Sequence, residues 1–298
     1  MAPRTRTRTV SVSVAALLAT ALAACSGGSG PEASPDAGAE PDAGPTAEAA
    51  AVSHVHGLGI DPADDTLYVA THEGVLAVDE DGGWEVVSDE ADYMGFAVAG
   101  PGHFLGSGHP AAGSDEPSNR GLLESTDAGR TWESRSLGGE ADFHALEYAH
   151  GTVYGYDSVT GMLRVSEDHV QWQDRAQVPV VDIAIAPEDP DMVLGTTQEG
   201  VVTSLDGGET FGAGAQPVLM LLSWAEQDAL YGVDPAGVVF RSPDGGAEWK
   251  EAGTVPGGRP QALAAVDADR LLVAGQDGVH ESLDGGRTFT QRLALTAR

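Results

Sequence analysis

The sequence has little positive charge and only one cysteine. Lys and Arg total 15 against 46 Asp and Glu, which gives a formal net charge of −31. So acidic a chain repels phosphate backbones, and no basic run offers a local exception, so we exclude nucleic acid as a partner. The single cysteine excludes a disulfide framework and any Cys-x-x-Cys metal or redox pair. Beyond the N-terminus, no apolar run approaches the length needed to span a bilayer.

The N-terminal 51 residues have the composition of a targeting segment followed by a linker. Three arginines in the first eight residues precede an apolar run at residues 10–24, which predicts a secretory signal over residues 1–25. Residues 26–51 are almost wholly Gly, Ser, Pro, Ala, Asp, Glu and Thr, without periodicity or aromatics. Such a segment cannot bury a core, so we expect a disordered tether there and a folded domain over residues 52–298.

The end of the apolar run resembles a bacterial lipobox. It reads Leu-Ala-Ala followed by Cys25, the only cysteine in the chain. The resemblance implies that Cys25 is lipidated and becomes the new N-terminus, so that the protein is extracytoplasmic and anchored to the cell membrane. The alternative is an ordinary secretory signal with an incidental cysteine.

One short pattern recurs through the rest of the chain. It reads S-x-D-x-G-x-x-aromatic, with its aspartate at Asp127, Asp206, Asp244 and Asp284, and a degenerate copy at Asp168. The copies recur about every 40 residues, which is a spacing typical of repeat architectures. Ser and Asp side chains accept hydrogen bonds from turn amides, and Gly takes a positive φ. We therefore expect this pattern, the Ser/Asp repeat, to close a hairpin in each unit.

The Ser/Asp repeat resembles the Asp-box, or BNR repeat, of sialidases, sortilin-type receptors and photosystem II assembly factors. In those families the motif lies away from the active site, so the resemblance implies a structural role for its aspartates. A calcium site is the alternative, although a short hairpin turn supplies few oxygen ligands.

Around each repeat the chain reads as four short strands. Six such units begin near residues 52, 91, 140, 178, 217 and 256. Strand-rich units of about 40 residues predict an all-β fold, a six-bladed β-propeller with Asp-box hairpins. Each unit keeps its own strand after the repeat, with Phe211 opening that strand in the fourth unit. Ring closure is therefore not expected to need an N-terminal strand.

Aligning the six units places polar residues in two columns that should meet at one end of the channel. The column at the start of the innermost strands reads His56, Met94, His144, Asp182, Met220 and Gln261. The column after the second strands reads His72, His109, Asp157, Gln198, Asp234 and Gln276. In a blade the first strand starts, and the second ends, on the face opposite the Ser/Asp repeats.

Four histidines and two methionines in these columns raise two interpretations, a wet channel lined by polar residues and a metal site at the channel mouth. Imidazole and thioether ligands suit copper, and imidazole alone suits zinc. The predicted ligands are His56, His72, His109, His144 and Met94. Six other column members are expected to face a ligand: Asp157, Asp182, Met220, Asp234, Gln261 and Gln276. The alternative is that these are polar residues lining a water-filled channel.

An enzyme is the second class of function that the sequence leaves open. The phrase that contains His54 and His56 resembles a family of bacterial lipoproteins labelled glycosyl hydrolases. A sialidase needs three arginines to clamp a carboxylate, and only Arg259 and Arg120 can reach the relevant face. A different glycosidase needs only two carboxyl groups near the channel. Residues considered for it are Tyr93, Tyr156, Asp157, Asp182 and Glu73.

These patterns predict a cell-surface lipoprotein whose propeller is a binding or assembly module, with a glycoside hydrolase as the alternative. The expected partners are the membrane, through the lipid anchor, and a protein, glycan or metal ligand that the sequence does not identify. A monomer is expected.

Overall fold

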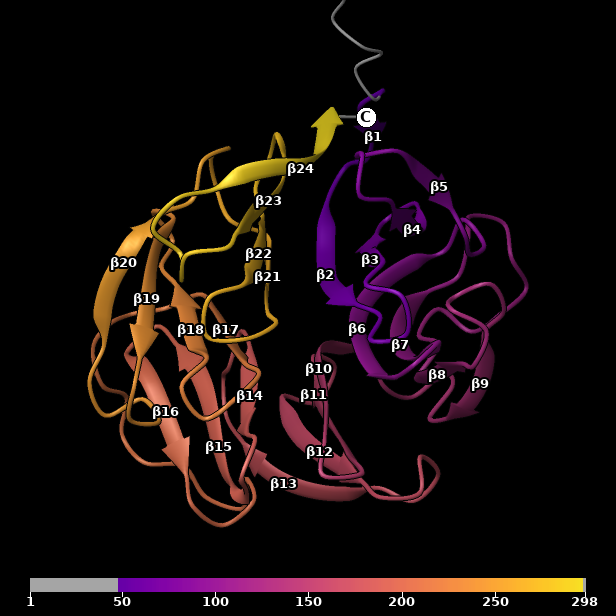
Figure 1. Cartoon of the computed structure of the whole chain (residues 1–298). Coiled ribbons are helices and arrows are strands. Elements are labelled where there is room, and N and C mark those ends of the chain that lie inside the picture. Colours follow the sequence, from indigo (N-terminus) through magenta and orange to yellow (C-terminus); the bar gives the residue numbers. More distant parts are fainter. Residues whose placement is uncertain (1–47, 297–298) are drawn as a thin grey trace, which may run out of the picture. The chain divides into compact units, whose positions relative to one another are not determined.

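The computed structural model describes residues 48–296, which form 24 β-strands and no helix (Figure 1). The predicted signal, Cys25 and most of the predicted tether lie outside the described residues. Within residues 48–296, no helix is present that could cross a membrane.

The strands form six sheets, which are the six blades, and strands that follow one another along the chain within a blade are antiparallel. Blade 1 holds β2 (Val55–Ile60), β3 (Leu67–Thr71), β4 (Gly74–Val78) and β5 (Trp84–Val86). Blade 2 holds β6 (Asp92–Gly100), β7 (His103–His109), β8 (Leu122–Ser125) and β9 (Glu133–Ser136). Blade 3 holds β10 (Phe143–Ala149), β11 (Thr152–Asp157), β12 (Met162–Ser166) and β13 (Gln173–Gln177).

The second half of the chain continues the same order. Blade 4 holds β14 (Ile183–Ala186), β15 (Asp189–Thr197) and β16 (Gly200–Ser204). Blade 5 holds β17 (Leu221–Trp224), β18 (Leu230–Val233), β19 (Val238–Ser242) and β20 (Lys250–Thr254). Blade 6 holds β21 (Ala262–Ala265), β22 (Leu271–Ala274), β23 (Gly278–Ser282) and β24 (Thr290–Thr296).

The innermost strands contact one another in a closed ring, from β2 through β6, β10, β14, β17 and β21 back to β2 (Figure 1). Apolar side chains fill the interfaces between neighbouring blades. For example, Tyr68 of blade 1 packs with Phe96 and Phe104 of blade 2, and Leu163 of blade 3 packs with Ile183 of blade 4. The predicted six-bladed β-propeller is confirmed.

The Ser/Asp repeats all lie in the turn that follows the third strand of a blade. In the repeat at Asp127, Ser125 Oγ accepts a hydrogen bond from the Gly129 amide at 3.0 Å. Asp127 Oδ1 accepts one from the Thr131 amide at 2.8 Å. The repeats at Asp206, Asp244 and Asp284 make the same pair of bonds. Asp206 accepts hydrogen bonds from both the hydroxyl and the amide of Thr210. These two bonds lower the pKa of Asp206 to about 2.

The degenerate repeat around Asp168 keeps only part of this network. Asp168 Oδ1 accepts bonds from the amides of Val170 and Gln171, at 3.0 and 2.7 Å. His169 occupies a glycine-like conformation there, with φ of 62°. Ser166 Oγ donates to the same oxygen at 3.4 Å, so the aspartate accepts all the bonds that organise this turn.

Two expectations about the blade edges were wrong. Blade 4 has no regular outer strand after its repeat, and Phe211 does not open one, because only an isolated bridge joins Val201 to Ala215. Blade 6 has a fifth strand, β1 (Ala50–Ala51), which pairs in parallel with β24. The N-terminal segment therefore takes part in closing the ring, and ordered structure begins before the expected boundary at residue 52.

Candidate functional site

A β-bulge lies near the start of the inner strand in each of the first three blades. The strand register shifts between Val55 and Gly57, between Tyr93 and Gly95, and between Phe143 and Ala145. The extra residues are His56, Met94 and His144. A bulge re-aims the side chain that it carries, and here it sets the three predicted ligands at one end of the channel.

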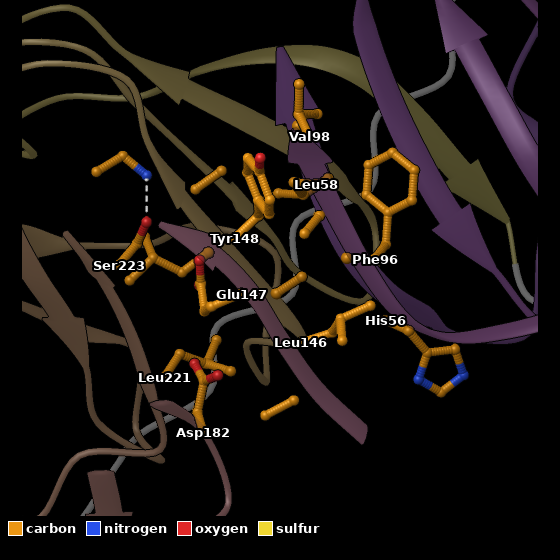
Figure 2. A pocket seen from close by; sticks show the side chains of 18 of the residues that line it. His56, Leu58, Phe96, Val98, Leu146, Glu147, Tyr148, Asp182, Leu221 and Ser223 are labelled. Carbon is orange, nitrogen blue, oxygen red and sulfur yellow. Dashed lines mark hydrogen bonds between the residues drawn. The ribbon is translucent and has the colours of Figure 1, made fainter. Parts of the chain in front are cut away.

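The inner strands of all six blades line a central cavity of about 770 Å³. Its wall combines apolar side chains, such as Leu58, Phe96 and Leu146, with a comparable polar surface (Figure 2). Five of the six residues in the predicted inner column are in the wall: His56, Met94, His144, Asp182 and Gln261. The expected convergence of this column is therefore present for all members except Met220.

His56, His72 and Asp92 form a compact group, which we call the Asp92 cluster. Their potential ligand atoms all lie within 4.8 Å of one another. His72 Nδ1 is 2.8 Å from Asp92 Oδ2, and His56 Nε2 is 3.5 Å from Asp92 Oδ1. The imidazole of His54 lies beside them, with ring centroids 4.7 Å from His56. Blades 1 and 2 thus supply two nitrogen donors and a carboxylate to one point.

The other two predicted ligands meet at a second carboxylate. We call His109, Asp142 and His144 the Asp142 cluster. Asp142 Oδ2 is 2.8 Å from His144 Nε2 and 3.9 Å from His109 Nε2. His109 and Asp92 are paired across β6 and β7, so the two clusters are neighbours on the same face.

Several buried polar atoms in these clusters have no hydrogen-bond partner among residues 48–296. They are His56 Nε2, Asp92 Oδ1 and Asp142 Oδ1. A buried polar atom without a partner carries a free-energy penalty of about 1–3 kcal/mol, so native structures seldom contain one without a functional reason.

The pKa values of the two bulge histidines, His56 and His144, are shifted in opposite directions. Burial, followed by the neighbouring His54 and His72, lowers the pKa of His56 to about 3, so its ring is neutral and carries a free lone pair. The hydrogen bond to Asp142 raises the pKa of His144. Imidazoles bind metal ions in the neutral form, which is the form that His56 holds at neutral pH.

Two further carboxyl groups face the cavity, Glu147 from within β10 and Asp182 from just before β14 (Figure 2). Burial, reinforced by Asp182, raises the pKa of Glu147 to about 8. Burial also raises the pKa of Asp182 to about 6, against hydrogen bonds from the amides of Leu222 and Ile183. Glu147 is therefore largely protonated at neutral pH, while Asp182 is largely ionised.

Several residues expected to face a ligand have structural roles instead. Asp157 is completely buried and accepts bonds from Asp142 N, Val159 N and Thr160 Oγ1. Asp234 closes its own turn by accepting from two amides. Met220 packs in the core between blades 5 and 6.

The two glutamines of these columns also differ. Gln261 lines the cavity, but its side-chain oxygen accepts the amide of Val55 at 2.9 Å and so joins blade 6 to blade 1. Gln276 is exposed and outside the cavity wall. Of the second column, only His72 and His109 join the clusters described above.

The carboxylates of both clusters were not predicted from the sequence. Asp92 and Asp142 stand two residues before the bulge positions Met94 and His144, and His54 stands two residues before His56. Extending the aligned column by two residues would have found this His, Asp, Asp series. Glu147, three residues after His144, carried no comparable signal.

No known family model matches the sequence, and no curated protein sequence is detectably similar to it. The fold has many structural relatives. An ancestral GH74 enzyme matches with a TM-score of 0.54 and 14% identity, over 83% of this chain and 39% of that protein. The GH74 xyloglucanase of Xanthomonas campestris matches at 0.52 and 16% identity, over 83% of this chain and 46% of that one.

YCF48 from Cyanidioschyzon merolae is a structural relative of similar length. It matches with a TM-score of 0.51 and 14% identity, over 81% of this chain and 85% of that protein. The chain spans less than half the length of the two GH74 proteins. At these identities the likeness is one of fold, and it defines this chain as a β-propeller without assigning an activity.

Proposed function

We propose that this chain is a cell-surface lipoprotein whose propeller is a binding module with a transition-metal site at the Asp92 cluster. The observation that carries the proposal is the convergence of His56, His72 and Asp92, with ligand atoms within 4.8 Å of one another. His56 Nε2 and Asp92 Oδ1 are buried and lack partners, so an ion between them would satisfy both.

The donor set favours zinc or copper. Ligands of one tetrahedral zinc ion lie roughly 3 to 3.5 Å apart, because each bond is about 2.0 to 2.1 Å long. The distances of 2.8 and 3.5 Å from Asp92 to His72 and His56 are close to this spacing. Three protein ligands leave a position open, and the His72 side chain is 39% exposed. A protein or glycan partner could therefore reach a bound ion.

The surface location is proposed from the sequence. The lipobox-like end at Cys25 supports a lipid anchor, and the Ser/Asp turns support membership of the Asp-box, or BNR, group of propellers. A Cys25→Ala variant should lose membrane association and appear in the soluble fraction. Quantitative retention of that variant in membranes would overturn the anchor.

Metal analysis tests the site. The full chain is stripped with chelator, and zinc and copper(II) affinities are measured by competition titration. His56→Ala and His72→Ala should each weaken zinc binding by at least about tenfold. His150→Asn is the matched control, because His150 binds the Ala186 carbonyl after the far end of β10 and its φ of 54° suits Asn. Equal zinc affinity in all four proteins would overturn the metal site.

A glycoside hydrolase remains the second function, and one observation favours it. Glu147 and Asp182 both line the cavity, and their pKa values are raised to about 8 and about 6. A protonated and an ionised carboxyl group are the pair that glycosidases use as acid and base or nucleophile. The other residues considered fit poorly, because Tyr93 is buried against Asp89, and Glu73 binds Ser53.

A panel of aryl glycosides separates the two functions. Hydrolysis that Glu147→Gln abolishes and His56→Ala leaves intact would establish the enzyme. Absence of turnover in a protein that binds zinc would favour the binding module.

A further inference from the structure

The Asp142 cluster combines a buried carboxylate with two imidazoles, although its potential ligand atoms are spread more widely than those of the Asp92 cluster. The Asp142 side chain is only 8% exposed, and its Oδ1 has no partner among the described residues. Its Oδ2 accepts a hydrogen bond from Ser158 Oγ at 2.9 Å, which fixes the orientation of the carboxylate. The second carboxylate at this end of the channel is therefore held in place with an unsatisfied oxygen.

The hydrogen bond of His109 decides which of its nitrogens carries the proton. Nδ1 lies 2.7 Å from the carbonyl oxygen of Ser118, and a carbonyl can only accept. Nδ1 is therefore the donor, and in the neutral ring Nε2 carries a lone pair. That lone pair lies 3.9 Å from Asp142 Oδ2. In that form His109 Nε2 and Asp142 Oδ2 are both acceptors, and a cation between them would be favourable, although Oδ2 already accepts from Ser158 and His144.

The same hydrogen bond is typical of histidines that bind metals. Such a histidine usually donates its other ring N–H to a carbonyl or carboxylate, which fixes both tautomer and ring orientation. His144 adds a second imidazole from the bulge in β10, with Nε2 at 2.8 Å from Asp142 Oδ2. In the structure this nitrogen donates to Asp142, so His144 would have to release that proton to offer a lone pair to an ion at the same point.

We infer that the Asp142 cluster binds a second divalent transition-metal ion, with His109 Nε2, the Asp142 carboxylate and His144 as its ligands. The inference rests on the proposed metal-binding function and extends it. Because Asp92 and His109 are paired across β6 and β7, the two ions would be neighbours at one channel mouth. Blades 1 to 3 would then form a two-metal face.

Zinc stoichiometry tests the second site. The chelator-stripped full chain is titrated with zinc chloride by equilibrium dialysis, with bound metal measured by elemental analysis. Wild type and the His150→Asn control should bind about two equivalents, and His56→Ala and His109→Ala about one each. The double variant should bind none. His144→Ala gives a second probe, and thermal unfolding in chelator confirms that each variant folds.

The outcomes separate this inference from the proposed function. One equivalent in wild type, lost in His56→Ala and kept in His109→Ala, would overturn the second site and leave the first. Two equivalents that persist in both His109→Ala and His144→Ala would also overturn it, since the second ion would then lie elsewhere. No bound zinc in any protein would overturn both.

Discussion

Blades 1 to 3 and blades 4 to 6 meet the channel mouth in different ways. The fourth and sixth blades use their polar side chains to hold the ring together: Asp182 accepts the Leu222 amide at 2.8 Å, and Gln261 accepts the Val55 amide at 2.9 Å. In the fifth blade, Met220 packs in the core. Among residues 48–296, the corresponding His56, Met94 and His144 of the first three blades make no such bond to a neighbouring backbone.

The same position of the repeat therefore has different roles in the two halves. In one half its side chain bonds to the backbone of a neighbouring blade, and in the other it lies in a cluster of histidines and a carboxylate. Both halves aim a side chain at the channel from the start of an inner strand. In blades 1 and 3 those side chains are imidazoles, which meet Asp92 and Asp142. A satisfied polar group stabilises the fold, whereas a buried group without a partner has its binding capacity free.

The largest expected effect is metal-dependent stabilisation through blades 1 to 3. A zinc concentration 100-fold above the dissociation constant should stabilise the wild-type protein by about 2.7 kcal/mol per site. His56→Ala should lose this increment, because it removes a ligand, whereas Gln261→Ala should retain it. Denaturant unfolding with zinc or with chelator measures the effect. An equal increment in His56→Ala would break the distinction between the two halves.

The second-largest effect on stability is expected from removing a hydrogen bond between blades 4 and 5. Asp182→Ala leaves the Leu222 amide without its partner, and we expect a loss of about 1–3 kcal/mol in unfolding free energy. Asp182→Asn, which keeps one acceptor oxygen, should lose less. Both are measured by urea unfolding in chelator. A wild-type midpoint for Asp182→Ala would show that this bond does not stabilise the ring.

The unfolding free energy should depend on pH through the raised pKa of Glu147. Its folded pKa of about 8 lies above the unfolded value, so between the two the native state holds a proton that the unfolded chain has released. The contribution of Glu147 to the unfolding free energy is therefore most favourable below about pH 4, and it declines as the pH rises toward about 8. Glu147→Gln should flatten that decline in chelator. Unfolding free energies at about pH 5 and pH 8 that differ equally in both proteins would contradict the assignment.

The smallest effect is expected from the thioether in the cavity wall. Met94→Leu conserves volume and should change stability by less than about 1.5 kcal/mol. Zinc stoichiometry should stay unchanged, because nitrogen and oxygen ligands hold that ion, while copper(I) affinity should fall if the sulfur takes part. Competition titration with each metal checks this. A loss of zinc would mean that Met94 positions the imidazoles.

The sequence predicted most of the blade pattern because the relevant signals are local. The Ser/Asp repeat specifies its own turn, as the bonds of Ser125 and Asp127 show. The outer edges depend on distant pairing and were missed. Ala50 and Ala51 acquire strand structure only by pairing with Leu295 and Thr296, which no local pattern could indicate.

The candidate site was predicted in part, because the repeat itself shows which positions are equivalent. Column alignment brought His56 and His144 to one end of the channel, because equivalent positions in repeated units occupy equivalent places in space. Whether a side chain is free to bind depends on its neighbours. Asp157 and Asp142 lie at the same end of blade 3. The oxygens of Asp157 accept hydrogen bonds from amides and a hydroxyl, whereas Oδ1 of Asp142 has no hydrogen-bond partner among the described residues.

The closure of blade 6 has a mechanical consequence. The ring is sealed where β1 runs parallel to β24, through the two residue pairs Ala50 with Leu295 and Ala51 with Thr296. If Cys25 carries a lipid, a pull on it would first reach residues 48–52, where the Glu48 carbonyl accepts Trp84 Nε1 at 2.7 Å and Ala50 and Ala51 pair with β24. This short segment would bear the load before the strands of the blades.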